Sequence, residues 1–280
     1  MLRFLRLPKR VLQAIIPNQI FSLLLSRVVE EYNELSQGEK DFFGLIESHV
    51  NSIVDVGART DTFYATYPSS QGIKRKVFMF EANPAFVSKL RAITPFIDQN
   101  NFIFNVAIGK EPGNLYYYYD TQSFIKKSNV GNISKYKSAK PIEVRTLDSY
   151  SEIIPDIDFL KTDIEEMDFY ALLGASTFLP KIRFIQFELG LGMPYLDRTV
   201  SNSDYWELLE PSFDLFILED EANPIYKAIP NLPLLLTLNS EAKIVVNILQ
   251  KLGYGFNIVG INREYKIPQT ILSNIGEINF

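Results

Sequence analysis

The sequence of 280 residues contains no cysteine and a single histidine, His49. Without cysteine the chain has no disulfide, no cysteine nucleophile and no cysteine-held zinc or iron–sulfur site. One histidine is too few for motifs that need two, such as H-E-x-x-H. No G-x-S-x-G pattern accompanies His49, so nothing indicates a Ser-His-Asp hydrolase, and we expect His49 in a helix-to-strand connection without a chemical role. Chemistry in this chain must depend on carboxylates, lysines, hydroxyls and the backbone.

The charge balance is also informative, because the formal net charge is −5. That value excludes a general nucleic-acid binder that works by neutralising phosphates. Hydrophobic residues make up 46% and charged residues 22% of the chain, which is typical of a globular protein. We therefore expect a folded protein with no nucleic-acid partner. We also expect it in the cytoplasm, because its N-terminal segment, considered next, lacks the features of a signal peptide or a membrane span.

The N-terminal segment is basic up to Arg10 and then uncharged over 11–26. Pro17 interrupts this stretch, which is too short to span a bilayer and lacks the cleavage site of a signal peptide. We interpret it as a helical extension that packs on the domain, with peripheral membrane contact through 1–26 as the alternative. The expected division is an extension over 1–49 and a domain over 50–280.

From about residue 50, short apolar segments alternate with segments of helical period. We expect strands over 51–56, 76–81, 101–107, 158–162, 182–188 and 213–218. We expect helices over 85–93, 167–178, 204–210 and 241–252. This alternation predicts an α/β fold with a mostly parallel central sheet and helices on both faces.

In such a sheet, ligands bind beyond the carboxyl ends of the strands. The first strand ends with Asp55 and Gly57, and the second ends with Glu81. An acidic side chain at the second position suits two ribose hydroxyls, but the G-x-G-x-x-G pattern that cradles a pyrophosphate is absent. A ligand with ribose and no pyrophosphate fits better, and S-adenosylmethionine is a common one.

An ordered set of motifs resembles the FkbM-type S-adenosylmethionine-dependent methyltransferases. The motifs are IVDVGA at 53–58, FEANP at 80–84, NVAIG at 105–109, RTLDSY at 145–150, IDFLKTDIEEMD at 157–168 and IQFE at 185–188. The resemblance covers about residues 50 to 265. It implies a Rossmann-like class I methyltransferase fold that usually methylates oxygen, with a glycan or a small metabolite as acceptor.

The resemblance also implies roles for individual residues. The S-adenosylmethionine site would comprise Asp55, Gly57 and Ala58 at the methionine part, and Glu81, Ala82 and Asn83 at the ribose. The catalytic residues at the reacting end would be Lys161, Asp163 and Glu165. If the strand continues through Asp163, the alternation of side chains places these three on one face.

The sequence departs from the family pattern at three positions. Arg59 and Asp61 stand where the family usually has asparagine and a second glycine, and Glu166 replaces a further glycine. These departures favour the alternative of a non-catalytic binding module on the same fold. A nicotinamide-dependent oxidoreductase is a third hypothesis, disfavoured by the missing glycine pattern.

Each candidate residue also has a purely structural interpretation. Asp55 could cap the following helix, Glu81 could be a solvated strand end, and Asp163 could form a surface salt bridge in a loop. A carboxylate or lysine would remove the hydroxyl proton. The alternative is a divalent cation, held by Asp163, Glu165 and Glu188, that lowers the pKa of the hydroxyl. We favour the route without a metal, because acids at two strand ends do not define a coordination geometry.

Overall fold

The computed structural model describes residues 36–60, 63–67, 69–72, 74–93, 100–118, 123–126, 139–164, 167–190, 200–220, 223–229 and 231–277. The chain forms two compact units, and each is described by itself. The larger unit comprises Glu47–Phe187 and Pro194–Ser212, and the second comprises Met1–Ile46, Glu188–Met193 and Phe213–Phe280. The predicted membrane contact through 1–26 and the predicted helical extension up to residue 35 lie outside the described residues. The predicted boundary at 49–50 therefore stays a prediction.

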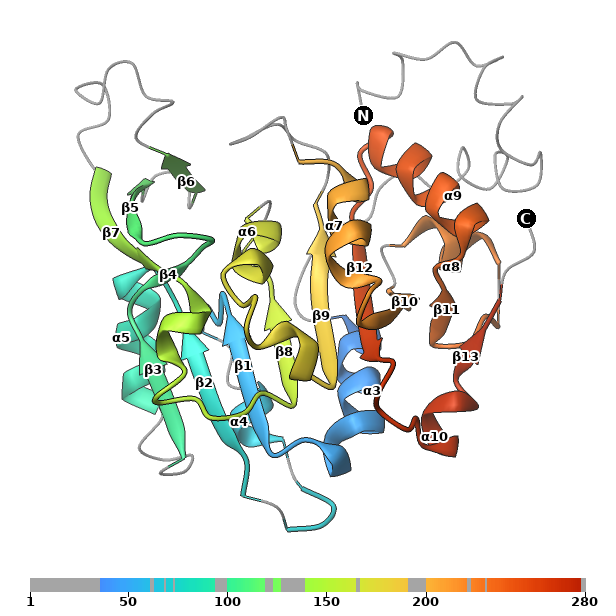
Figure 1. The fold of residues 1–280 in the computed structure, drawn as a ribbon, viewed down its shortest axis with the longest axis horizontal. Helices are drawn as coiled ribbons and strands as arrows, with labels where there is room; N and C mark the ends of the chain where they lie inside the picture. The colour runs from blue at the N-terminus through green and yellow to red at the C-terminus, as the bar shows by residue number, and fades with distance from the viewer. Residues whose placement is uncertain are drawn as a thin grey trace. The chain divides into compact units, whose positions relative to one another are not determined.

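Five parallel strands form the main sheet of the larger unit (Figure 1). They are β1 (Ser52–Val56), β2 (Lys76–Phe80), β3 (Asn101–Phe104), β8 (Phe159–Thr162) and β9 (Phe184–Leu189). Their order in the sheet is β9-β8-β1-β2-β3. The chain thus builds outward from β1 on one side and then returns to build from β8 on the other. The strand order reverses between β1 and β8, which is where ligands bind in open α/β sheets.

Helices cover both faces of this sheet. Tyr64 of α4 (Phe63–Thr66) packs edge-on against Phe159, and the two ring centroids are 5.5 Å apart. On the opposite face, Tyr150 of η5 (Leu147–Tyr150) packs edge-on against Phe80. Phe80 aligns with Thr162 through Val56, three residues beyond Phe159, so side-chain alternation places the two contacts on opposite faces. The α/β fold with a parallel central sheet and helices on both faces, predicted from the sequence, is confirmed for this unit.

The described part of the larger unit also contains the α-helices α5 (Pro84–Ile93), α6 (Asp168–Leu173) and α7 (Asn202–Leu209), and the short 3-10 helices η1 (Glu47–His49) and η6 (Leu179–Lys181). A smaller four-stranded sheet has the order β4-β7-β5-β6. Its strands are β4 (Ala107–Ile108), β5 (Gly113–Tyr118), β6 (Ser123–Lys126) and β7 (Ala139–Arg145). The expected strand 101–107 is therefore two strands in different sheets, β3 and β4, with a break at Asn105.

The second unit contains the last strands of the chain. Strand β10 (Phe213–Leu218) pairs antiparallel with β11 (Leu235–Thr237) and with β12 (Phe256–Asn262), and β11 pairs parallel with β13 (Ile275–Gly276). The helices are α3 (Gln37–Ile46), α8 (Pro224–Ala228), α9 (Ser240–Lys251) and α10 (Gln269–Leu272), and α3 contacts β10 and α10. The mostly parallel pairing expected of the sheet does not extend to β10.

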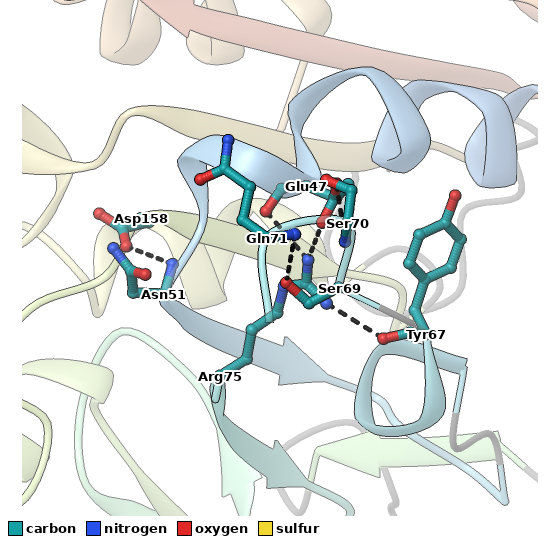
Figure 2. A network of polar contacts seen from close by, with 8 residues as sticks. All are labelled: Glu47, Asn51, Tyr67, Ser69, Ser70, Gln71, Arg75 and Asp158. Atoms are coloured by element: carbon teal, nitrogen blue, oxygen red, sulfur yellow. Dashed lines mark hydrogen bonds and ion pairs between the residues drawn. The ribbon is translucent and has the colours of Figure 1, made fainter. Parts of the chain in front are cut away.

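A polar network fastens the amino ends of the strands in the larger unit (Figure 2). The guanidinium of Arg75, just before β2, pairs with the carboxylate of Glu47 and donates to the Tyr67 carbonyl at 3.1 Å. Asp158, just before β8, accepts from the Asn51 amide at 2.7 Å. Because Arg75 and Glu47 are both buried, removing either would leave an uncompensated charge.

The predicted helix over 167–178 is shorter in the structure, where α6 ends at Leu173. A Cβ on Gly174 would lie 2.1 Å from the Gly109 carbonyl oxygen, so the chain passes very close to the segment after β4 at this point. The carboxylate of Asp148 accepts from the Ser176 hydroxyl at 2.8 Å and the Thr177 hydroxyl at 2.6 Å. These contacts hold the chain in a turn beyond Gly174.

None of the helices that the structure describes combines the length and the apolar character needed to cross a membrane.

Candidate functional site

The loop after β1 lies at the point where the strand order reverses. The amides of Gly57 and Ala58 both donate to the Phe80 carbonyl, at 2.8 and 3.2 Å. On the other side, the Asp163 amide donates to the Val56 carbonyl at 2.9 Å. The ends of β2 and β8 are thereby fixed on either side of the end of β1. Predicted residues from three separate motifs meet at one edge of the sheet.

Gly57 is required by the fold itself. Its φ of +89° lies in the region that side chains disfavour, and a Cβ would lie 2.1 Å from the Asp163 carbonyl oxygen. The resemblance stated from the motifs places Gly57 at the methionine part of a cofactor. The close neighbour in the structure is instead the backbone after β8, so substituting Gly57 would disturb the junction of β1 and β8 whatever binds there.

Glu81 is buried, with 6% of its surface exposed, so its interpretation as a solvated strand end is wrong. Its two carboxylate oxygens accept from backbone amides on different loops: Oε2 from Arg59 at 2.8 Å and Oε1 from Asn83 at 2.6 Å. Burial raises the pKa of Glu81, and the two amide bonds partly oppose this. Each carboxylate oxygen can accept two hydrogen bonds, so the group retains acceptor capacity for a ligand.

Asn105 was not assigned a role from the sequence. Its side-chain amide donates to two successive carbonyls, Glu81 at 3.0 Å and Ala82 at 3.1 Å. The available signal was its position in the NVAIG motif, directly after β3 and therefore at the same edge of the sheet as Glu81.

Asn83 has a structural role that explains the Asn-Pro pair. Its Oδ1 accepts from the Ala85 amide at 2.9 Å, which satisfies an amide in the first turn of α5. Its own backbone amide is the one that donates to Glu81. The residue therefore joins the start of α5 to the predicted ribose-binding carboxylate.

β8 ends at Thr162, so the strand does not continue through Asp163 as the prediction assumed, but the side chains of Lys161 and Asp163 still meet. The Lys161 Nζ atom lies 3.1 Å from Asp163 Oδ2. The lysine side chain is only 7% exposed, whereas that of Asp163 is 41% exposed. Glu165, the third predicted catalytic residue, lies outside the described residues, as do Asp61 and Glu166.

Asp55 lies within β1 and is 3% exposed, so its interpretation as a helix cap is wrong. The next helix, α4, begins only at Phe63. Asp55 aligns with Lys161 on β8, which in turn aligns with Gln186 on β9. All three are buried on the same face, so a row of polar side chains crosses the three strands, and Lys161 in this row contacts Asp163.

An apolar cluster adjoins Glu81. Its members are Ala82, Ala107, Ile142 and Val144, against which Met167 packs. Ala82 directly follows the carboxylate, and Met167 precedes α6. A buried apolar cluster therefore lies next to the buried carboxylate of Glu81.

Within the described parts of the chain, no three histidine, cysteine, aspartate or glutamate side chains are grouped so that they could hold a metal ion.

The family model of the methyltransferase FkbM domain matches residues 55–254. The chain belongs to this family. The matched segment begins at Asp55 and includes every residue predicted for the site, from Asp55 to Glu165. The resemblance stated from the motifs is thus confirmed for this FkbM domain protein. No curated protein matches its sequence.

Several solved structures resemble the FkbM domain protein at low identity. Methyltransferase FkbM from Methylobacillus flagellatus KT is 14% identical with a TM-score of 0.44, over 86% of this chain and 58% of that one. A putative O-methyltransferase from Klebsiella pneumoniae is 11% identical with a TM-score of 0.40, over 90% and 94% of the two chains. Fibrillarin from Aeropyrum pernix, in complex with natively bound S-adenosyl-L-methionine, is 10% identical with a TM-score of 0.40, over 75% and 66%. The chain therefore spans less than two thirds of the Methylobacillus protein.

Proposed function

We propose that this FkbM domain protein transfers a methyl group from S-adenosylmethionine to a hydroxyl of a glycan or small metabolite. The observation that carries the proposal is the buried carboxylate of Glu81, held by backbone amides from two loops at the carboxyl edge of β1 and β2. A charged group is costly to bury without a function or full pairing, and Glu81 keeps acceptor capacity beyond its two short amide bonds.

The residues at this edge fit the chemistry of S-adenosylmethionine. Glu81 would accept from the two ribose hydroxyls, with Asn83 beside it. Ala82 and Met167 of the apolar cluster would pack against a flat face of the adenine ring, whose polar atoms lie at its edge. Asp55, Gly57 and Ala58 would lie at the methionine part. Bound S-adenosylmethionine supplies a methyl group already activated on a sulfonium.

The remaining catalytic requirements fall to the chain's own side chains. The acceptor hydroxyl must be held in line with the methyl group, and its proton must be removed. Of the two described candidates, Asp163 is the exposed one, so Asp163 would accept the proton. Lys161 is buried against it and would hold the carboxylate in place. Glu165 is the third proposed participant.

The test has two stages. Calorimetric titration with S-adenosylhomocysteine should show saturable binding to the wild-type protein, and Glu81→Ala should weaken it by roughly 1.5–3 kcal/mol for each hydrogen bond lost. Glu152→Ala, an exposed acid in the same unit, is the matched control. Circular dichroism should be unchanged in both variants. An absence of binding, or an unchanged affinity in Glu81→Ala, would refute the cofactor assignment.

The second stage separates catalysis from binding. Incubation with S-adenosylmethionine and a panel of glycans and hydroxylated metabolites should give a product heavier by one methyl group. Of the three departures from the family pattern, Arg59 lies in the described part of the chain. It has a left-handed backbone conformation, with φ of 50°, and its amide donates to Glu81. Cofactor binding without a methylated product on any acceptor would favour the non-catalytic binding module.

A further inference from the structure

Three loops meet around the carboxylate of Glu81, and one of them contains a residue that no motif role accounts for. Asn105 follows β3 and reaches back to the loop after β2. Its side-chain amide donates to the carbonyls of Glu81 and Ala82, at 3.0 and 3.1 Å. It thus engages two successive peptide units rather than a side chain.

The same two peptide units face Glu81 from their other side. In a trans peptide the carbonyl and the amide point in opposite directions, and no described peptide bond is cis. The peptide that joins Ala82 to Asn83 presents its carbonyl to Asn105 and its amide to Glu81 Oε1, at 2.6 Å. The amide of Ala82, in the preceding peptide, also stabilises the ionised Glu81.

We propose that Asn105 is a positioning residue for Glu81: it orients the peptide units after β2 so that their amides fix the carboxylate for ligand binding. The contribution of Asn105 passes through the backbone, and the residue itself touches no reacting group. The expected effect of Asn105 on cofactor affinity rests on the proposed function. The expected effect of Asn105 on the Glu81 carboxylate does not.

The geometry makes this role testable by substitution. Asn105 is exposed, so removing its side chain leaves no cavity in the core. Without the Asn105 side chain, the carbonyls of Glu81 and Ala82 would be free to turn toward water. The amides of Ala82 and Asn83, which belong to the same peptide units, would then no longer be held in one direction. The ionised carboxylate of Glu81 would then be less well stabilised, while its burial would remain.

The first experiment does not involve the cofactor. The pKa of the Glu81 carboxyl is measured by NMR titration in the wild type, in Asn105→Ala and in the control Asn114→Ala, an exposed asparagine on β5. We expect a higher pKa in Asn105→Ala, because the amide donors that stabilise the charged form are loosened. We expect no change in Asn114→Ala. An equal pKa in the wild type and Asn105→Ala would overturn the positioning role.

The second experiment measures coupling. Asn105→Ala should lower the affinity for S-adenosylhomocysteine by about five- to tenfold when Glu81 is present. When Glu81 is already replaced by alanine, the same change should lower the affinity by less than about twofold. Equal losses in both backgrounds would show that Asn105 acts independently of Glu81 and would refute the inference. If the wild-type protein does not bind S-adenosylhomocysteine, the proposed function fails, and the NMR titration alone decides the role of Asn105.

A third variant guards against misfolding. Asn105→Ser keeps one short donor and should give an intermediate pKa and affinity. If neither Asn105→Ala nor Asn105→Ser unfolds cooperatively in urea, Asn105 is a folding residue and the positioning role is wrong.

Discussion

Lys161 and Asp163 form an ion pair of 3.1 Å in which the aspartate is 41% exposed and the lysine only 7%. The pair is thus asymmetric, with a buried cation holding an accessible carboxylate at the end of β8. A purely structural surface salt bridge would contribute at most about 1 kcal/mol to stability. It would not require the lysine to be buried and the aspartate to be accessible. The asymmetry favours Asp163 as the group that meets an acceptor.

We expect Asp163→Asn to keep the affinity for S-adenosylhomocysteine within a few-fold and to lower methyl transfer by roughly a hundredfold, since the amide cannot accept the proton. The amide keeps the volume of the carboxylate, so packing should be preserved. Asp214→Asn, at an exposed pair with Arg263, is the matched control and should leave turnover unchanged. Turnover at the wild-type rate in Asp163→Asn would show that the base is elsewhere.

The sequence predicted the main sheet and the position of Glu81 because both depend on local patterns. Buried parallel strands are short apolar runs, and the residue that follows such a run lies at the ligand edge whatever the distant contacts are. The run ending at Phe80 was sufficient to place Glu81 correctly.

The features that were missed depend on contacts between distant segments. Apolar runs carry no direction, so nothing showed that β10 pairs antiparallel. The end of α6 depends on the close approach of Gly174 to Gly109, which lies sixty-five residues earlier in the chain (174 − 109). Similarly, the neighbouring sequence alone allows Asp55 to be the cap of the next helix. Only the alignment of β1 with β8 shows that Asp55 lies beside Lys161.

Gly57 should not tolerate a Cβ even in the absence of a ligand. We expect Gly57→Ala to lower the free energy of unfolding by more than the roughly 1–2 kcal/mol that a left-handed conformation costs, because the Cβ also meets the Asp163 carbonyl. Gly253→Ala is the matched control, since Gly253 has a similar φ of +94° and open space around its Cβ position. Urea unfolding measures both. Equal losses in the two variants would contradict the close approach of β1 and β8.

Arg59 occupies a conformation that suits asparagine better. Its φ is 50°, and its hydrogen bond to Glu81 comes from the backbone amide, which asparagine would also supply. The positive charge of its side chain also favours the ionised form of Glu81. We expect Arg59→Asn to raise the free energy of unfolding by about 0.5–1 kcal/mol, because asparagine tolerates left-handed backbone. The reciprocal change Asn231→Arg, at φ of 61°, should lower it by a similar amount. A loss of stability in Arg59→Asn would show that the arginine side chain stabilises the loop.

Cofactor affinity should fall in mild acid because of Glu81. Its pKa is raised by burial above the ordinary 4.5, and only the ionised carboxylate offers all its acceptor sites to ribose. Protonation has the opposite effect on folding: with a pKa higher in the folded state than in the unfolded one, Glu81 contributes stability below its unfolded pKa that is lost as pH rises through the folded value. Weaker binding in this range therefore does not result from Glu81-linked unfolding.

Calorimetric titration with S-adenosylhomocysteine from about pH 8 down to about pH 5 should show the affinity of the wild type falling at the acid end. Glu81→Gln cannot ionise, so its affinity should be weaker throughout and nearly independent of pH. Glu152→Gln, an exposed acid, should follow the wild type. A constant wild-type affinity over the range, or the same pH dependence in Glu81→Gln, would mean that the ionisation of Glu81 does not control binding.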